Sequence, residues 1–441
     1  MLSKYITNLA ICLLLLSINE ITSAQLVDGY PEEIANKLLE QQQAETSSIA
    51  KMPNPEAANF LFSNKRWDPG SKILVAFNGG DVNLHRAIEQ QAKLWEKYAN
   101  INFDFGYDPI KNKYRTWSES DAHRVAHIRI GFSEPGYWST VGTDSISNYG
   151  HGERNSASMN FQGFADIPIE LLNPRWKYIV IHEFGHALGL DHEHQHPICG
   201  KEFRWETGPN GEESVYKIFK DWQGWKPQVV DINLKPKPIK TNSDYMTQIP
   251  DKESVMMYAM PAQAFIKGDK SPCFTRVENK NISKLDGLGA KMAYPMNPTE
   301  ALQTADAYKR AALSLASTPL DGLNDTEKTV VKSRLETALQ SRKPLLYIQI
   351  HNESDRKEAL KIQELARESG FFAPGIENVS HKNLKSGPQI EVRYFRDSDL
   401  DSAQQISSLL TNQLGVEKVK ILHVKALAST VTRNMVEVWY P

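Results

Sequence analysis

This chain of 441 residues is poor in cysteine, has no block of basic residues and, beyond its N-terminus, has no long apolar run. Without a basic block, and with a formal net charge of −2, nothing in its electrostatics favours nucleic-acid binding. No later run approaches the ~20 apolar residues that a membrane-spanning helix needs, so we expect the mature chain not to be a transmembrane protein. Of its three cysteines one lies near the N-terminus, which leaves two in the mature chain.

The N-terminus has the pattern of a secretory signal peptide. Lys4 precedes an apolar run over residues 9–16, and the small residues Thr22 to Ala24 follow, as expected around a cleavage point. The apolar run is too short to span a bilayer comfortably. We predict a signal peptide over residues 1–24, which would take Cys12 with it, and a secreted protein, or a periplasmic one in a Gram-negative source.

One stretch carries the strongest chemical signal: residues 182–192 read His-Glu-Phe-Gly-His-Ala-Leu-Gly-Leu-Asp-His. On a helix, His182 and His186 lie one turn apart on the same face and can bind one metal ion. Gly189 can adopt a positive φ, so the helix can end there and the chain can turn to present His192. Three histidines and an open fourth position predict a catalytic zinc site, because structural zinc sites usually fill all four positions and favour cysteine.

Chance is a poor explanation of this motif. A lone His-Glu-x-x-His can simply be an amphipathic helix with solvated or buried histidines. Three His, one Glu and one Gly at fixed offsets, however, arise from composition alone with a probability on the order of 10⁻⁵ to 10⁻⁴ in such a chain.

Glu183 lies beside the first histidine and is the predicted general base. A zinc ion held by three neutral ligands lowers the pKa of a bound water toward ~7. Glu183 would take up the proton of that water and later return it to the leaving amine of a cleaved peptide bond.

This long motif resembles the signature of the metzincin clan of zinc endopeptidases, which continues downstream to a methionine-containing tight turn. Ser254 to Tyr258, Ser-Val-Met-Met-Tyr, resembles that turn in the astacin family, and Glu193 and the run Arg66–Gly70 are further astacin-like marks. The resemblance covers roughly residues 65–295. It implies an α+β zinc-peptidase domain, with a twisted sheet, an active-site helix and a Met-turn.

The resemblance also implies roles for two residues of the turn. Met256 would pack beneath the metal, where a flexible thioether fills an irregular floor. Tyr258 would lie beside the metal, as a ligand of its resting state or as a hydrogen-bond donor to the developing oxyanion. A buried tyrosine with a satisfied hydroxyl is the alternative for Tyr258.

The chain departs from the astacin pattern after Glu193. There the astacins have an Arg and an Asp-Arg-Asp cluster, whereas this chain reads His194-Gln-His-Pro-Ile-Cys-Gly200, and the astacin cysteine pattern is absent. Cleavage specificity therefore does not transfer, and the chain is more similar to bacterial matrixin-like or astacin-like enzymes that lack these cysteines. A fourth protein ligand would close the site to water, so we expect His194 and His196 on the surface or cleft wall.

Cys199 and Cys273 remain after loss of the signal peptide. In an oxidising compartment they can form a disulfide, which would tether the segment after the metal motif to the region after the Met-turn. Two separate buried thiols are the alternative, since sequence gives no Cα distance.

The order of elements before the motif predicts a mixed α and β arrangement. Residues 73–77 and 126–131 have strand patterns, and residues 84–98 have helical spacing. We expect residues 156–161 to form an edge strand that pairs with an extended polypeptide substrate.

Length and composition favour two domains with short flanks. We predict a leader or short pro-segment over residues 25–64, a catalytic domain over 65–295, a helical spacer over 296–343 and an accessory α+β domain over 344–441. Asp28 is a candidate to block the metal from the leader, with a solvated aspartate as the alternative.

The accessory domain reads as a small sheet-and-helices module of βαββαβ or βαβαββ order. It faintly resembles the sporulation-related repeat domain, a cell-envelope binding module. A ligand face is conceivable at Arg393, Tyr394, Phe395 and Trp439, and ordinary strand residues are the alternative.

These observations predict a secreted zinc-dependent metalloendopeptidase that hydrolyses peptide bonds of protein or peptide substrates. One alternative is an envelope- or matrix-binding protein with a vestigial zinc site, against which an intact Glu183 argues. The other is a zinc amidase that acts on cell-wall peptides.

Overall fold

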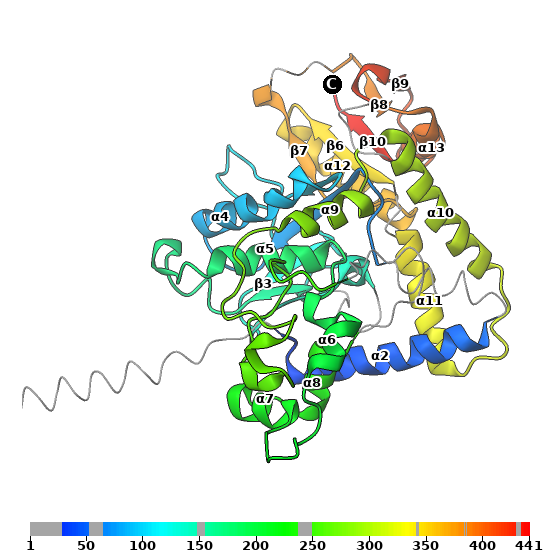
Figure 1. Cartoon of the computed structure of the whole chain (residues 1–441). Coiled ribbons are helices and arrows are strands. Elements are labelled where there is room, and N and C mark those ends of the chain that lie inside the picture. Colours follow the sequence, from blue (N-terminus) through cyan, green and yellow to red (C-terminus); the bar gives the residue numbers. More distant parts are fainter. Residues whose placement is uncertain are drawn as a thin grey trace, which may run out of the picture.

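The computed structural model describes residues 29–52, 65–147, 155–236, 249–340, 344–382, 384, 386–428 and 434–441. These residues form two five-stranded sheets with many helices, so the predicted mixed α and β class is confirmed (Figure 1). The predicted signal peptide and Asp28 lie outside the described residues. Within the described ranges, no helix is both long and apolar enough to cross a membrane.

The first sheet has the strand order β2-β1-β3-β5-β4. Its strands are β1 (Ser71–Phe77), β2 (Ile101–Asp104), β3 (Ile128–Gly131), β4 (Tyr137–Ser139) and β5 (Met159–Phe161). Neighbouring strands run parallel except β4, which is antiparallel to β5. Side chains of β1 alternate between the two faces, as the pleat requires.

The edge-strand prediction for residues 156–161 is wrong, because β5 lies between β3 and β4. The antiparallel β4 forms the edge instead, and a strand of three residues is too short to show an alternating pattern in the sequence. Its outward carbonyls already accept hydrogen bonds: the Gly29 N–H donates to Tyr137 O (3.1 Å), and the Tyr30 hydroxyl donates to Ser139 O (2.9 Å).

Two helices pack on one face of the first sheet. Helix α4 (Val82–Ala92) begins at Asp81, whose carboxylate accepts from the Leu84 N–H, and it continues as a 3₁₀ turn, η1 (Lys93–Lys97). Helix α5 (Trp176–Ala187) lies beside α4, and both contribute to the main hydrophobic core with the odd-numbered residues of β1.

A helical region follows α5. It consists of α6 (Pro197–Glu202), α7 (Val215–Gln223) and α8 (Pro227–Leu234) around a core rich in aromatic side chains. Helix α9 (Lys284–Ala293) then returns to the main core through Ala290 and Ala293.

The described parts of the predicted leader and spacer are mainly helical. The leader forms α2 (Glu32–Lys51), and the spacer forms α10 (Pro298–Ala316) and α11 (Asp325–Gln340). Helix α2 packs against both α11 and α8 (Figure 1). Residues distant in sequence therefore form one support at this end of the molecule.

A buried ion network joins α2, α11 and the start of the first sheet. Arg334 of α11 contacts Glu45 of α2 (2.9 Å) and Asp144 (2.7 Å), and Lys65 contacts Asp144 (2.5 Å). The side chains of Glu45, Asp144 and Arg334 are at most 8% exposed. Two carboxylates and two cations thus balance one another, with only Lys65 partly exposed.

The second sheet has the order β7-β6-β10-β8-β9 and carries two helices on one face. Its elements are β6 (Leu345–Ile350), α12 (Arg356–Glu368), β7 (Ile376–Asn378), β8 (Ile390–Tyr394), α13 (Leu400–Leu414), β9 (Val419–His423) and β10 (Met435–Trp439). The observed order βαββαββ has one strand more than the sequence predicts. Strand β7 has three half-buried residues, without the alternation that reveals a strand.

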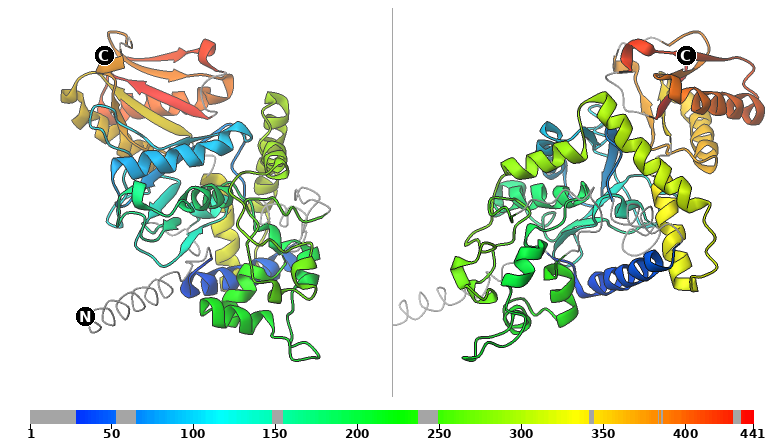
Figure 2. Two further views of the ribbon diagram at one scale, coloured as in Figure 1. Left: turned by 60° about the vertical axis from the view of Figure 1, so that its left-hand side comes forward. Right: turned by 45° about the vertical axis from the view of Figure 1, so that its right-hand side comes forward.

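The back face of the first sheet is covered by distant parts of the chain. One continuous hydrophobic cluster contains Leu74 and Ala76 of β1, Ile34 of α2, and Leu345 and Met435 of the second sheet. Figure 2 shows the second sheet at one end of the molecule and α2 at the other. The two sheets and the leader helix therefore share a core.

This packing bears on the candidate ligand face of the second sheet. Phe395 belongs to the shared cluster, and Trp439 is 5% exposed beneath the guanidinium of Arg393, which lies 4.0 Å from its ring centre. The aromatic side chains are thus packed in the way ordinary strand residues are, which favours the alternative reading of this face.

Candidate metal centre

Helix α5 holds the first two histidines of the motif on one buried face. His182 and His186 are four residues apart, and their Nε2 atoms are 3.1 Å apart. The helix is fixed from outside, because the indole of Trp95 donates to the Ile181 carbonyl at 2.8 Å. Phe184, on another side of the same turn, is fully buried in the main core. The predicted placement of both imidazoles on one face is therefore what the structure has.

The chain turns back after α5 at Gly189, whose φ is +95°, a conformation that glycine adopts without a steric penalty. Other side chains satisfy the carbonyls at this helix end: the Trp67 indole donates to Ala187 O (2.9 Å) and the Tyr294 hydroxyl to Leu188 O (2.5 Å). The turn brings His192 back, so that its Nε2 lies 3.0 Å from that of His186.

Backbone carbonyls fix the tautomers of two of these rings. Nδ1 of His182 lies 2.7 Å from Val255 O, and Nδ1 of His186 lies 2.7 Å from Leu190 O. A carbonyl only accepts, so each Nδ1 carries the hydrogen and each neutral ring directs the lone pair of its Nε2 toward the other.

This donor set fits a zinc ion. The ligand atoms of His182, His186 and His192 all lie within 4.8 Å of one another, and all three residues are buried. Zn–N bonds of ~2.0–2.1 Å at tetrahedral angles place neighbouring nitrogens roughly 3.3 Å apart, close to the spacing found here. Lone pairs that face one another at this distance repel unless a cation lies between them.

Glu183 is the next residue of α5 after His182 and has no exposed surface. A carboxylate in so dry a place beside three imidazoles is costly unless it is compensated by a positive charge or a hydrogen-bond partner. Its role beside a metal-bound water stays a prediction.

The segment around Met256 lies directly under α5. A Cβ atom placed on Gly185 would lie 2.5 Å from Met256 Sδ, so only glycine lets the thioether come this close to the helix between His182 and His186. The segment is itself a tight turn, in which the Met257 N–H donates to Ser254 O at 3.1 Å. The Glu193 N–H donates to Met256 O (3.0 Å) and ties this turn to the third histidine.

Asp286 of α9 holds this turn and was not singled out as a site residue from the sequence. Its carboxylate accepts from the Ser254 hydroxyl (2.6 Å) and the Val255 N–H (2.9 Å), and it completes a capping box with Ser283. Burial raises its pKa above the ordinary value despite these hydrogen bonds. The available signal is the run Ser283-Lys-Leu-Asp286, which is typical of a helix start and indicates the cap and not the contact with the turn.

Tyr258 lies beside the triad, within a group of rings. Its ring centre is 4.3 Å from that of His192, 6.0 Å from that of His182 and 4.3 Å from that of His194. The prediction that this tyrosine lies next to the histidines agrees with these distances.

His194 and His196 were expected on the surface or the cleft wall. A surface position is wrong, since they are 0% and 7% exposed, whereas the cleft wall stays a prediction. His196 Nδ1 accepts from the Ile198 N–H and caps α6, and His194 Nε2 lies 2.7 Å from Asn233 O. Both have local partners in the helical region after α5, which the sequence could not show.

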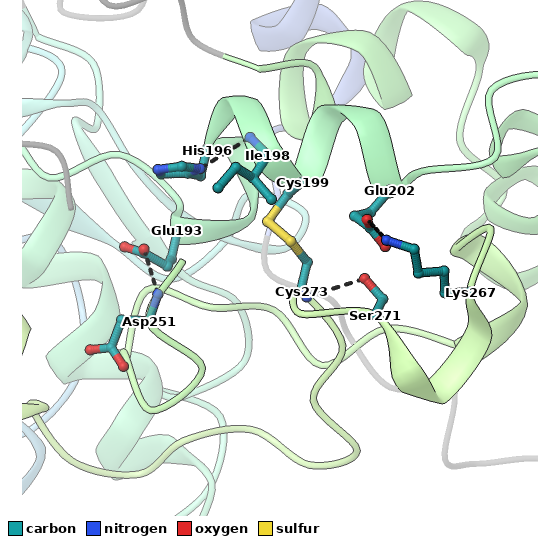
Figure 3. The surroundings of a disulfide bond; sticks show 9 residues. All are labelled: Glu193, His196, Ile198, Cys199, Glu202, Asp251, Lys267, Ser271 and Cys273. Atoms are coloured by element: carbon teal, nitrogen blue, oxygen red, sulfur yellow. Dashed lines mark hydrogen bonds and ion pairs between the residues drawn. A yellow bond between two sulfur atoms is a disulfide. The ribbon is translucent and has the colours of Figure 1, made fainter. Parts of the chain in front are cut away.

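Cys199 and Cys273 are joined by a disulfide, with their Cα atoms 5.6 Å apart. Figure 3 shows the bond between α6 and the segment after Tyr258, next to His196. In the same view, Glu193 accepts from the Asp251 N–H at 2.8 Å (Figure 3). The region after the third histidine is thus attached covalently and by hydrogen bonds to the region that holds Met256.

Comparison with known proteins gives limited similarity. No family model and no curated protein matches this chain. Two solved structures of myroilysin are 26% identical to it, each over 53% of this chain, with 97% and 86% of their own chains covered and TM-scores of 0.40 and 0.34. High choriolytic enzyme 1, a hatching-enzyme zinc protease of the medaka Oryzias latipes, is 17% identical over 53% of this chain and 96% of its own, with a TM-score of 0.31. At such TM-scores these likenesses support no conclusion on fold or activity.

Proposed function

We propose that this protein is a secreted zinc-dependent metalloendopeptidase. The observation that carries the proposal is the convergence of three buried imidazole nitrogens, with a buried glutamate as the next residue of the same helix. Three neutral ligands leave a fourth position for water or substrate, which is the arrangement of catalytic zinc.

Glu183 acts as general base and then as general acid. When bound, zinc polarises a water and the scissile carbonyl, as a Lewis acid does. Glu183 takes up the proton of the attacking water and delivers it to the leaving amine. Its carboxylate is fully buried on the helix that carries His182 and His186, and a general base in this position holds the proton between the two steps.

Met256 and Tyr258 support the site that the three histidines form. The thioether of Met256 supports α5 at Gly185 and so fixes the spacing of the two helical histidines. The ring of Tyr258 lies beside that of His192, and its phenol would bind the resting metal or donate a hydrogen bond to the oxyanion that develops on the substrate.

The proposed domains follow the predicted boundaries. Residues 1–24 are a signal peptide, 25–64 a leader or pro-segment, 65–295 the catalytic domain, 296–343 a spacer and 344–441 an accessory domain. A peptide that pairs with the outer edge of β4 needs the carbonyls of Tyr137 and Ser139, which the leader occupies through Gly29 and Tyr30. Displacement of these two residues would therefore precede substrate binding, which agrees with a pro-segment.

The test is hydrolysis of a quenched protein substrate by the chain without residues 1–30, which frees the carbonyls of Tyr137 and Ser139 and keeps α2, and by its Glu183→Gln variant. We expect the variant to keep its zinc and to lose about 10²–10⁴-fold in kcat, the usual contribution of a general base. Glu170→Gln makes the same change at an exposed position and should leave both unchanged. Equal activity of Glu183→Gln and wild type, or release of peptidoglycan fragments without protein cleavage, would sink the proposal.

A further inference from the structure

His194 is the most deeply buried histidine near the metal centre, although it is not a member of the triad. It has no exposed surface, and its ring centre lies 4.8 Å from that of His192 and 4.3 Å from that of Tyr258. The rings of His192 and Tyr258 are also 4.3 Å apart, so the three rings contact one another in a closed group. A substitution at His194 therefore alters the packing of the Tyr258 ring directly.

The end of α8 holds His194 in place. Its Nε2 donates to Asn233 O at 2.7 Å, since a carbonyl can only accept. The amide of the next residue, Gln195, donates to Ile232 O (3.0 Å) and Lys235 O (3.3 Å). The last carbonyls of a helix have no partner within it, so these two side chains supply donors that α8 lacks. With its Nε2 committed to Asn233, His194 does not direct this nitrogen at a metal.

Helix α8 is itself held in place by packing on two sides. Val229 and Ile232 pack on Ala35 of the leader helix α2, while Val230 and Leu234 share a hydrophobic cluster with the ring of Tyr258. Both faces of the helix are thus fixed by buried apolar contacts. A side chain bonded to its last carbonyls takes a definite position relative to the core.

The backbone of Tyr258 is also held, because the Thr275 hydroxyl donates to Tyr258 O at 3.3 Å. The orientation of an aromatic side chain depends on the groups that pack against its faces and edge, and two of those groups are His192 and His194.

We propose that His194 is a positioning residue, which holds the phenol of Tyr258 beside the third histidine through its hydrogen bond to the end of α8. This inference rests on the proposed function, in which Tyr258 assists the reaction. It assigns a role to the first departure from the astacin-like pattern after Glu193, in place of the surface role expected from the sequence.

The experiment is a double-mutant cycle with His194→Phe and Tyr258→Phe, in which kcat, KM and zinc content are measured for all four proteins. His194→Phe keeps a ring of similar size and removes the donor to Asn233. We expect it to lower kcat about tenfold, in the range typical of residues that orient a metal site, with KM and zinc content unchanged. In the Tyr258→Phe background the same change should have no further effect on kcat, because the residue it positions has lost its hydroxyl.

His196→Phe is the matched control, since it alters a neighbouring buried histidine that caps α6. Any loss it causes should be the same with and without Tyr258→Phe. Equal losses from His194→Phe in both backgrounds would show a general packing role and overturn the inference. If His194→Phe does not fold, His194→Met, which also removes the donor to Asn233, takes its place in the cycle, and loss of zinc from it would likewise overturn the inference. If the unsubstituted chain binds zinc but cleaves no peptide, both the proposed function and this inference are overturned. This outcome differs from failure of the inference alone, because it is seen before any variant is made.

Discussion

The molecule has two buried polar clusters of opposite character, the histidine triad and the ion network of Glu45, Lys65, Asp144 and Arg334. The triad gathers like groups, three imidazoles whose nitrogens face one another at 3.0–3.1 Å along the pairs through His186. The network gathers unlike groups, two carboxylates and two cations that neutralise one another. Charges that cancel within a cluster stabilise the fold, whereas nitrogen lone pairs that converge on one point are suited to bind a cation.

The largest effect that separates the two clusters should come from His186→Ala. Loss of one of three ligands leaves a site that cannot hold zinc firmly, so we expect loss of zinc on dialysis and a greater loss of activity than the roughly 10–100-fold typical of outer-shell changes. Zinc content and hydrolysis of a quenched protein substrate are the measurements. Retention of stoichiometric zinc by this variant would remove the basis of the comparison.

Arg334→Met should instead act on stability. It leaves the carboxylates of Glu45 and Asp144 with one cation, and breaking a buried pair in this way costs about 3–5 kcal/mol in the free energy of unfolding. Denaturant unfolding of the full chain measures this loss. The folded fraction should still bind zinc, and adding Glu45→Gln should recover part of the lost stability. Zinc loss without destabilisation would mean that the network belongs to the metal centre after all.

A smaller effect is expected from pH. Burial alone would raise the pKa values of Asp144 and Glu45, but the charges of Arg334 and Lys65 outweigh it and hold both values below the ordinary ones. Groups with a lowered pKa in the folded state stabilise it above their unfolded pKa, about 4, and this contribution is lost as pH falls through the folded values. Unfolding free energies measured from pH 6 down to pH 2 should therefore fall more steeply for wild type than for Arg334→Met. Parallel curves would contradict the network's role.

At alkaline pH the dependence has the opposite direction: the network's contribution to the free energy of unfolding is lost as pH rises. Burial alone would lower the pKa of Lys65, but Asp144 and Glu45 raise it above the ordinary value. Its contribution is complete below the unfolded value of about 10.4 and is lost as pH rises through the folded value. The network thus stabilises the fold over the whole range between.

The two clusters also differ in how far the sequence could predict them. The triad lies within eleven residues, and one helix with one glycine turn suffices to bring it together, so spacing alone predicted it. Glu45 and Arg334 are 289 residues apart, and no local pattern relates them. Helix α2 and helix α11 were each expected to be helical, but their pairing depends on tertiary packing.

The same distinction applies inside the metal centre. Gly189 and His192 could be assigned because their roles follow from backbone geometry near the motif. Asp286 supports the turn at Met256 from a helix some thirty residues away, and His194 depends on a carbonyl of α8, so both were missed or misplaced. Sequence spacing predicted the residues that would bind the metal more readily than the residues that hold those side chains in position.

The shared core behind the first sheet has a consequence for biosynthesis. The back face of β1 is covered in part by Leu345 and Met435, which the ribosome adds several hundred residues after Leu74. Until then an apolar surface of the growing chain stays open, which is the state in which nascent chains aggregate or engage chaperones. The zinc motif is therefore translated long before its sheet can be closed, and premature termination anywhere before residue 435 should yield an insoluble product rather than a smaller enzyme.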